Sequence, residues 1–189
     1  MEPRVRLSHV AFLVRSAEQA EEATRQFGFP SSPAEVWEGE GTKEIYVGDE
    51  SKSGRLLLME PMRDGAYRRA FQKRGAGLHH IAIDVLDLER YVLGLSGTGW
   101  LLHPQSLHTM KTTKTVYLAR PGFPGLIEAQ QRTEISKAPL FIERLEIQVS
   151  TAHLVMVNAL GIPEIHPSKD QKTWLTCDGT RFVADAFLL

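Results

Sequence analysis

The sequence predicts an α+β chain made of two copies of one unit (a strand, a helix and three further strands), followed by a third, shortened unit. The first observation is a repeated motif, residues 8–14 and residues 79–85, each read as a strand with a histidine near its start (His9, His80) and an alanine two residues later. Because strand side chains alternate between faces, each histidine shares a face with its alanine. The opposite face is apolar in both motifs and can pack on helices: Val10, Phe12, Val14, Ile81, Ile83 and Val85.

The second observation is an equal spacing between opening and closing strands in the two copies. Glu128 lies 48 residues after His80, and Leu57 lies 48 residues after His9, each within an apolar run. Two histidines and a carboxylate on converging strands predict a facial triad for a divalent metal ion: His9, His80 and Glu128. Leu57, at the fourth equivalent position, cannot bind a metal.

The two units are predicted element by element. In the first, we expect a strand over 5–14, a helix over 18–26 that begins at the N-cap Ser16, and strands near 34–38, 43–48 and 54–60. A helix over 64–74 links the units. In the second, we expect a strand over 78–85, a helix over 88–96 capped by Asp87, and strands near 99–103, 113–119 and 125–131.

The third observation is a polar connection over 131–138, followed by elements that repeat the start of the pattern. We expect a strand over 141–149, a helix over 152–160, and strands near 171–177 and 181–188 joined by a hairpin turn at Asp178-Gly179. Arg144 falls where the other units have histidine, so this third module lacks the opening ligand. The sequence therefore predicts a paired-module domain over 1–132 and a partial third module over 139–189.

Composition limits the class of protein. The chain has 189 residues, a net charge of −1 and 42% hydrophobic residues, which fits one sizeable domain or one domain with an appendage. This balance gives no reason to expect nucleic acid or a membrane surface as a partner. The single cysteine, Cys177, excludes an intrachain disulfide and fits either a reducing compartment or indifference to redox state. With no basic-then-apolar leader and no apolar run near ~18 residues, we expect a soluble, cytoplasmic protein.

Several motifs resemble the vicinal oxygen chelate superfamily, the glyoxalase and bleomycin-resistance fold, over about residues 5–132. Residues 71–82, which lead into the second histidine, are similar to the same stretch of methylmalonyl-CoA epimerases, as are the closing motif at 125–128 and the segment 41–45. The resemblance implies a U-shaped sheet, a β-cup, around a metal site. It also implies that His9, His80 and Glu128 hold a divalent metal ion. The chain departs from the family at Leu57, where the epimerases have glutamine.

The resemblance further implies that Glu44 and Glu128 flank the acidic carbon of a small carboxylate or acyl-CoA substrate. Enolisation needs a base near the proton, an electrophile for the developing oxyanion and dry surroundings. The metal would be the electrophile and Glu44 the base on one face. Glu128 could act on the other face if metal ligation leaves it a free oxygen. The leading hypothesis is a metal-dependent lyase or isomerase.

Two alternatives stay open. In the first, the cup is metal-free and binds a small molecule without catalysis, which the apolar Leu57 favours. In the second, the chain is an Fe(II) extradiol-type dioxygenase. Tyr117 precedes Glu128 by 11 residues, near the catalytic tyrosine of such enzymes, but their additional histidine is missing from residues 63–74. His79 is expected on the opposite face from His80. His103 and His108 are expected in or beside a loop of the second module, where they could reach the mouth of the cup, although such residues are more often on the surface.

A partner copy of the chain is also expected. The modules of this fold pair so that each covers the sheet edge of the other, and a third module has no partner within the chain. The apolar ending, residues 181–189, would then be covered across an isologous homodimer.

Overall fold

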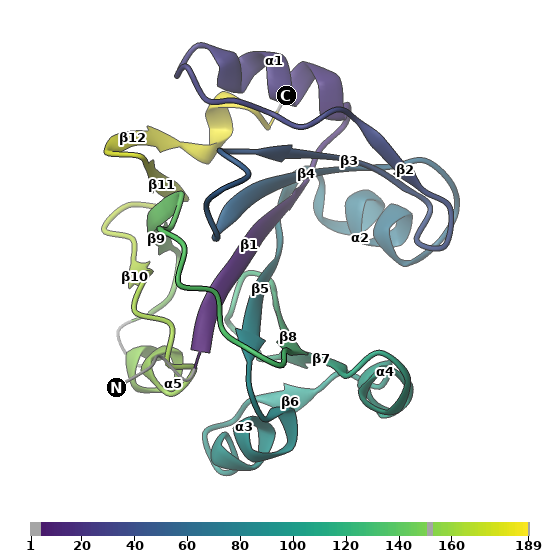
Figure 1. The fold of residues 1–189 in the computed structure, drawn as a ribbon, viewed down its shortest axis with the longest axis vertical. Helices are drawn as coiled ribbons and strands as arrows, with labels where there is room; N and C mark the ends of the chain where they lie inside the picture. The colour runs from purple at the N-terminus through teal and green to yellow at the C-terminus, as the bar shows by residue number, and fades with distance from the viewer. Residues whose placement is uncertain (1–4, 151–152, 189) are drawn as a thin grey trace.

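The computed structural model describes residues 5–150 and 153–188. An eight-stranded sheet in the order β2-β3-β4-β1-β5-β8-β7-β6 forms its larger part (Figure 1). The first module consists of β1 (Val5–Leu13), α1 (Ala17–Arg25), β2 (Glu35–Trp37), β3 (Thr42–Val47) and β4 (Arg55–Pro61). Helix α2 (Ala66–Arg74) leads to the second module, which consists of β5 (Gly77–Val85), α3 (Leu88–Gly94), β6 (Leu101–Leu102), α4 (Ser106–Thr112), β7 (Thr115–Ala119) and β8 (Leu126–Gln131). The predicted fold class is confirmed.

The two modules meet along the opening strands of the repeat. β1 and β5 run antiparallel, with His9 opposite Ala82 and Ala11 opposite His80. This reciprocal register is what a pseudo-twofold axis between the strands requires. It places the two histidines on one face of the sheet, close to that axis.

Each closing strand repeats the same register within its own module. β4 pairs in parallel with β1 and sets Leu57 opposite Ala11, while β8 pairs in parallel with β5 and sets Glu128 opposite Ala82. The equal spacing in the sequence therefore corresponds to equal positions in space. Leu57 occupies in the first module the place that Glu128 occupies in the second.

The two faces of the sheet have different environments, as alternation predicts. The predicted apolar face is fully buried in one large cluster, which also takes in the N-terminal alanines of α1 and Leu88 of α3. The other face carries a smaller cluster, which the side chains of α2 cover: Ala11, Leu13, Leu57 and Met59. The face of the sheet that carries His9 and His80 is therefore apolar around Leu57.

Helices α1 and α3 begin at the predicted capping residues, Ser16 and Asp87. The Ser16 hydroxyl accepts a hydrogen bond from the Gln19 amide at 3.3 Å, and the Asp87 carboxylate accepts one from the Arg90 amide at 2.9 Å. Each cap satisfies an amide that the first helical turn leaves without a partner. One helix was not predicted: the residues of α4 were expected to form a loop.

The C-terminal unit has its own four-stranded sheet, in the order β10-β9-β11-β12. Its elements are β9 (Ile142–Ile147), α5 (Leu154–Asn158), β10 (Ile165–Pro167), β11 (Trp174–Cys177), β12 (Thr180–Val183) and the 3-10 turn η2 (Ala184–Ala186). Asp178 and Gly179 form the predicted hairpin turn, both with positive φ. The strand pairing differs from that of the two modules, because β9 pairs in parallel with β10, the strand directly after α5. The expected helix start at Ala152 lies outside the described residues.

The C-terminal unit covers the apolar face of the large sheet, on the side away from α2 and α4 (Figure 1). The Phe187 ring meets Phe12 of β1 edge-on at 5.2 Å between centroids, and Phe182 stacks on Phe27 at 4.5 Å. Phe187 is fully buried. The apolar ending is therefore covered within the chain, which removes the reason for expecting it to be covered in a dimer. The homodimer and the division into two domains stay predictions.

Candidate metal centre

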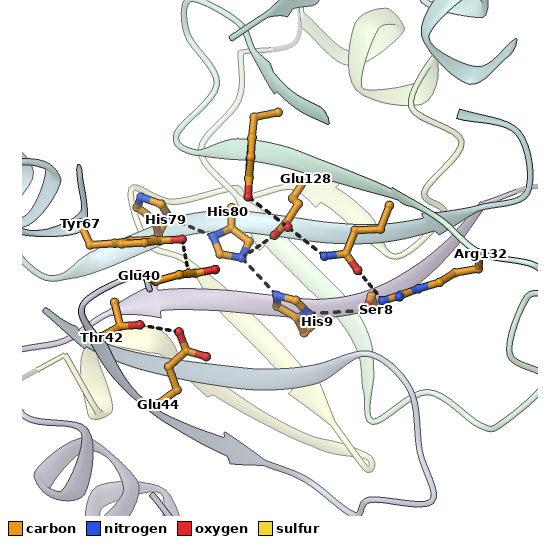
Figure 2. A network of polar contacts seen from close by, with 12 residues as sticks. Ser8, His9, Glu40, Thr42, Glu44, Tyr67, His79, His80, Glu128 and Arg132 are labelled. Atoms are coloured by element: carbon orange, nitrogen blue, oxygen red, sulfur yellow. Dashed lines mark hydrogen bonds and ion pairs between the residues drawn. The ribbon is translucent and has the colours of Figure 1, made fainter. Parts of the chain in front are cut away.

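Three side chains converge on the inner face of the sheet, as predicted. His9 Nε2 lies 3.1 Å from His80 Nε2, and His80 Nε2 lies 3.2 Å from Glu128 Oε2 (Figure 2). One potential ligand atom from each of the three residues lies within 4.8 Å of the others. Donors that share one ion at about 2.1 Å, with angles of roughly 90–110° between them, lie about 3.0–3.4 Å apart. The donor set fits a divalent metal ion, and so do the His9–His80 and His80–Glu128 spacings.

The atoms of these residues that point away from the centre have partners. Glu128 Oε1 accepts hydrogen bonds from Gln130 Nε2 at 2.8 Å and from the Tyr117 hydroxyl at 3.4 Å. His9 Nδ1 lies 3.5 Å from the Ser8 hydroxyl. His80 Nδ1 lies 2.8 Å from His79 Nδ1. Such outer partners fix the orientation of metal ligands and leave one donor atom of each side chain directed at the ion.

Burial keeps both imidazoles neutral. It lowers the pKa of His80 to about 4 and, together with the neighbouring His80, lowers the pKa of His9 well below its ordinary value. Burial also raises the pKa of Glu128. Neutral imidazole is the form that binds metals, so neither histidine has to lose a proton first at neutral pH.

These side chains line a cavity of about 190 Å³. Apolar and aromatic residues make up much of the wall, including Leu57, Met59, Tyr46 and Tyr67. The Tyr67 hydroxyl, from α2, donates a hydrogen bond to Glu40 Oε2 at 2.7 Å, so the helix is tied to the β2–β3 turn beside the cavity (Figure 2). The space suits a small ligand group with polar contacts on one side.

Glu44 lines the same cavity and is buried. Its Oε1 accepts a hydrogen bond from the Thr42 hydroxyl at 2.8 Å. Burial, reinforced by the carboxylates of Glu40 and Glu128, raises the pKa of Glu44 to about 7, although the Thr42 bond acts in the opposite direction. A carboxyl group that titrates near neutral pH is suited to act as a general base.

His79 departs from the sequence-based expectation. It was expected on the face opposite His80, but the β1–β5 register shifts between the pairs Ala11–His80 and Phe12–Leu78, which leaves His79 as an extra residue in β5. Such a β-bulge breaks the alternation of faces. The His79 ring consequently lies beside His80 and contacts Tyr67 of the cavity wall at 5.0 Å between centroids (Figure 2).

Other residues were missed or misplaced by the sequence analysis. Tyr46 lies opposite Leu57, as Tyr117 lies opposite Glu128, so the repeat that relates the ligands could have found it. The repeat gives no comparable indication for Gln130. Neither His103 nor His108 belongs to the described residues that line the cavity. His108 is an exposed residue of α4. No described helix is both long enough and apolar enough to span a bilayer.

No protein-family profile matches the sequence, and no curated protein matches it. Solved structures do match. A hypothetical protein from Bacillus halodurans C-125 is 20% identical, with a TM-score of 0.57 over 70% of this chain and 98% of that one. A methylmalonyl-CoA epimerase bound to methylmalonyl-CoA and NH4+ is 22% identical, with a TM-score of 0.52 over 70% of this chain and 99% of that one.

The chain has the glyoxalase fold. A third match, the methylmalonyl-CoA epimerase of Mycobacterium tuberculosis, is 21% identical, with a TM-score of 0.50 over 67% of this chain and 87% of that one. At this level of identity the match establishes the fold and leaves the activity open. About two thirds of the chain aligns in each comparison, as the sequence motifs indicated.

Proposed function

We propose that this protein is a metal-dependent lyase or isomerase that enolises or epimerises a small carboxylate or acyl-CoA substrate. One observation carries the proposal: the cavity that receives the three donor atoms of His9, His80 and Glu128 also receives the carboxyl group of Glu44. A divalent ion held by this triad would supply a Lewis acid for the negative charge that develops on a substrate oxygen. Leu57, at the fourth position, leaves room there for the substrate.

Glu44 is the base in this proposal. The Thr42 hydroxyl holds Oε1, so Oε2 is the atom that takes the proton from the substrate carbon. Burial keeps the side chain weakly hydrated and its pKa near neutral, so the ionised form is both present and basic at neutral pH. The side chains of Leu57 and Met59 give the reacting carbon partly apolar surroundings.

Glu128 has both oxygens engaged. Oε1 accepts hydrogen bonds from Gln130 and Tyr117, and Oε2 faces His80. This arrangement supports a role as a ligand with one donor oxygen. Its additional role as a second base, which would allow inversion at one carbon, requires that one of these contacts opens.

The first test is metal analysis of protein purified without a chelator. We expect close to one divalent ion per chain; substoichiometric metal with no uptake on titration would defeat the proposal.

The second test is exchange of the substrate α-proton with deuterated solvent, with methylmalonyl-CoA as the probe. Wild type should exchange the proton, whereas E44Q should lose most of the exchange while keeping its metal.

A non-catalytic binding protein is the second candidate, and the apolar floor around Leu57 and Met59 favours it. In that case ligands would raise the melting temperature equally with and without a chelator, and no proton exchange would occur.

An Fe(II) dioxygenase is the third candidate, supported by the hydrogen bond from Tyr117 to Glu128. Oxygen uptake with catechol-like substrates that depends on Fe(II) would distinguish it.

A further inference from the structure

His79 is a buried side chain next to the metal centre for which the proposed reaction has no use. Its Nδ1 lies 2.8 Å from His80 Nδ1, the nitrogen of the ligand that points away from Glu128 and His9. The bulge in β5 brings it there, because a regular strand would direct it to the other face of the sheet. The contact therefore depends on a local departure from regular structure.

The backbone at the bulge lies unusually close to the segment before β8. A Cβ atom at Gly125, directly before β8, would lie 2.9 Å from the His79 carbonyl oxygen, so only glycine allows the two segments to approach this closely. The Tyr67 ring closes the other side of His79, at 5.0 Å between centroids. The imidazole thus has little freedom to turn away from His80.

The hydrogen bond constrains the ligand. A histidine that binds a metal through Nε2 carries its remaining proton on Nδ1, and that proton needs an acceptor. Apart from His79 Nδ1, no acceptor for it is seen among the described residues. Without a metal, His80 can instead carry its proton on Nε2 and donate it to Glu128 Oε2, which lies 3.2 Å away. His79 Nδ1 can then donate a hydrogen bond to His80 Nδ1.

We propose that His79 is a positioning residue for the metal ligand His80: its Nδ1 accepts the His80 Nδ1 proton and so directs the His80 Nε2 lone pair at the ion. The inference rests on the proposed metal site and deepens it. His79 does not touch the ion or the substrate in this arrangement. It acts through the orientation and tautomer of its neighbour.

The test compares Co(II) affinity, followed by visible absorption, in four proteins. H79F keeps a ring against Tyr67 but has no acceptor, and H79N places an amide oxygen close to the position of Nδ1. H108N changes an exposed histidine outside the site. Loss of an outer-shell partner typically weakens metal binding about 10–100-fold. We expect that loss for H79F, near-wild-type affinity for H79N, and no change for H108N.

A second readout follows the tautomer directly. In the Zn(II)-loaded wild type, ¹⁵N NMR should show the proton of His80 on Nδ1 and that of His79 on Nε2, a pattern that a purely structural role would not require. This measurement decides the question even if H79F does not fold. Equal Co(II) affinity in H79F and wild type, or a proton on His79 Nδ1 in the loaded protein, overturns the positioning role alone. Failure of the wild type to bind Co(II) overturns the proposed function as well.

Discussion

The E44Q substitution should change how stability depends on pH, because burial makes the ionised form of Glu44 less favourable in the folded protein. The folded protein holds the pKa of this carboxyl at about 7 against an ordinary value of 4.5. Between these values the folded state binds a proton that the unfolded state releases, so the folded state loses stability as pH rises. Below 4.5 both states are protonated and the effect vanishes.

The size of the effect follows from the shift. Each pKa unit is worth 1.36 kcal/mol, so between pH 5 and pH 8 the wild type should lose up to about 2.5 kcal/mol relative to E44Q, which has no proton to release. The value is an upper limit, since water that enters the cavity reduces the cost of the charge. Titrating groups far from Glu44 are common to both proteins and cancel in the difference, whereas its charged neighbours Glu40 and Glu128 contribute to the measured curve because they interact with Glu44.

The assay is urea unfolding of wild type and E44Q at half-unit pH steps, with a chelator present so that metal binding does not contribute. E89Q is the control, because Glu89 is an exposed residue of α3 that does not line the cavity. Its difference from wild type should be nearly flat with pH. Parallel stability curves for wild type and E44Q would show that the folded protein does not raise the pKa of Glu44.

Three further predictions concern packing and the metal centre. F187A removes the fully buried ring that meets Phe12 and should cost about 3–5 kcal/mol in urea unfolding; a loss below 1 kcal/mol would mean that the C-terminal unit does not stabilise the large sheet. L57Q places an amide opposite Glu128 across the pseudo-twofold axis. It should bind Co(II) more tightly than wild type while costing about 1–3 kcal/mol without metal, and unchanged affinity would count against an open ligand position. G125A forces a Cβ atom against the His79 carbonyl oxygen and should both lower stability by about 1–3 kcal/mol and weaken Co(II) binding; wild-type values for both would argue against a tightly held bulge.

The repeat made the convergence of His9, His80 and Glu128 predictable from the sequence. Equal spacing from His9 to Leu57 and from His80 to Glu128 implies equal registers, and the strand pairs have those registers. Alternation then assigned the apolar side chains to the buried face. These features depend on periodicity and counting, which the sequence displays directly.

Features that depend on irregular backbone or distant packing could not be predicted in this way. The position of His79 follows from a bulge, and the register of a neighbouring strand decides where a bulge forms. Contact between Phe27 and Phe182 joins segments far apart in the chain, so no local pattern shows that the C-terminal unit covers the sheet. The short helix α4 begins at Ser106, whose hydroxyl bonds to the backbone of Tyr117 on the neighbouring strand.

Anomalous diffraction from crystals grown with Co(II) would locate the metal itself. We expect one strong peak per chain, about 2.0–2.2 Å from His9 Nε2, His80 Nε2 and Glu128 Oε2. A map with no peak between these atoms at saturating Co(II), or with Co(II) bound elsewhere while the two imidazoles remain in direct contact, would contradict the proposed metal centre.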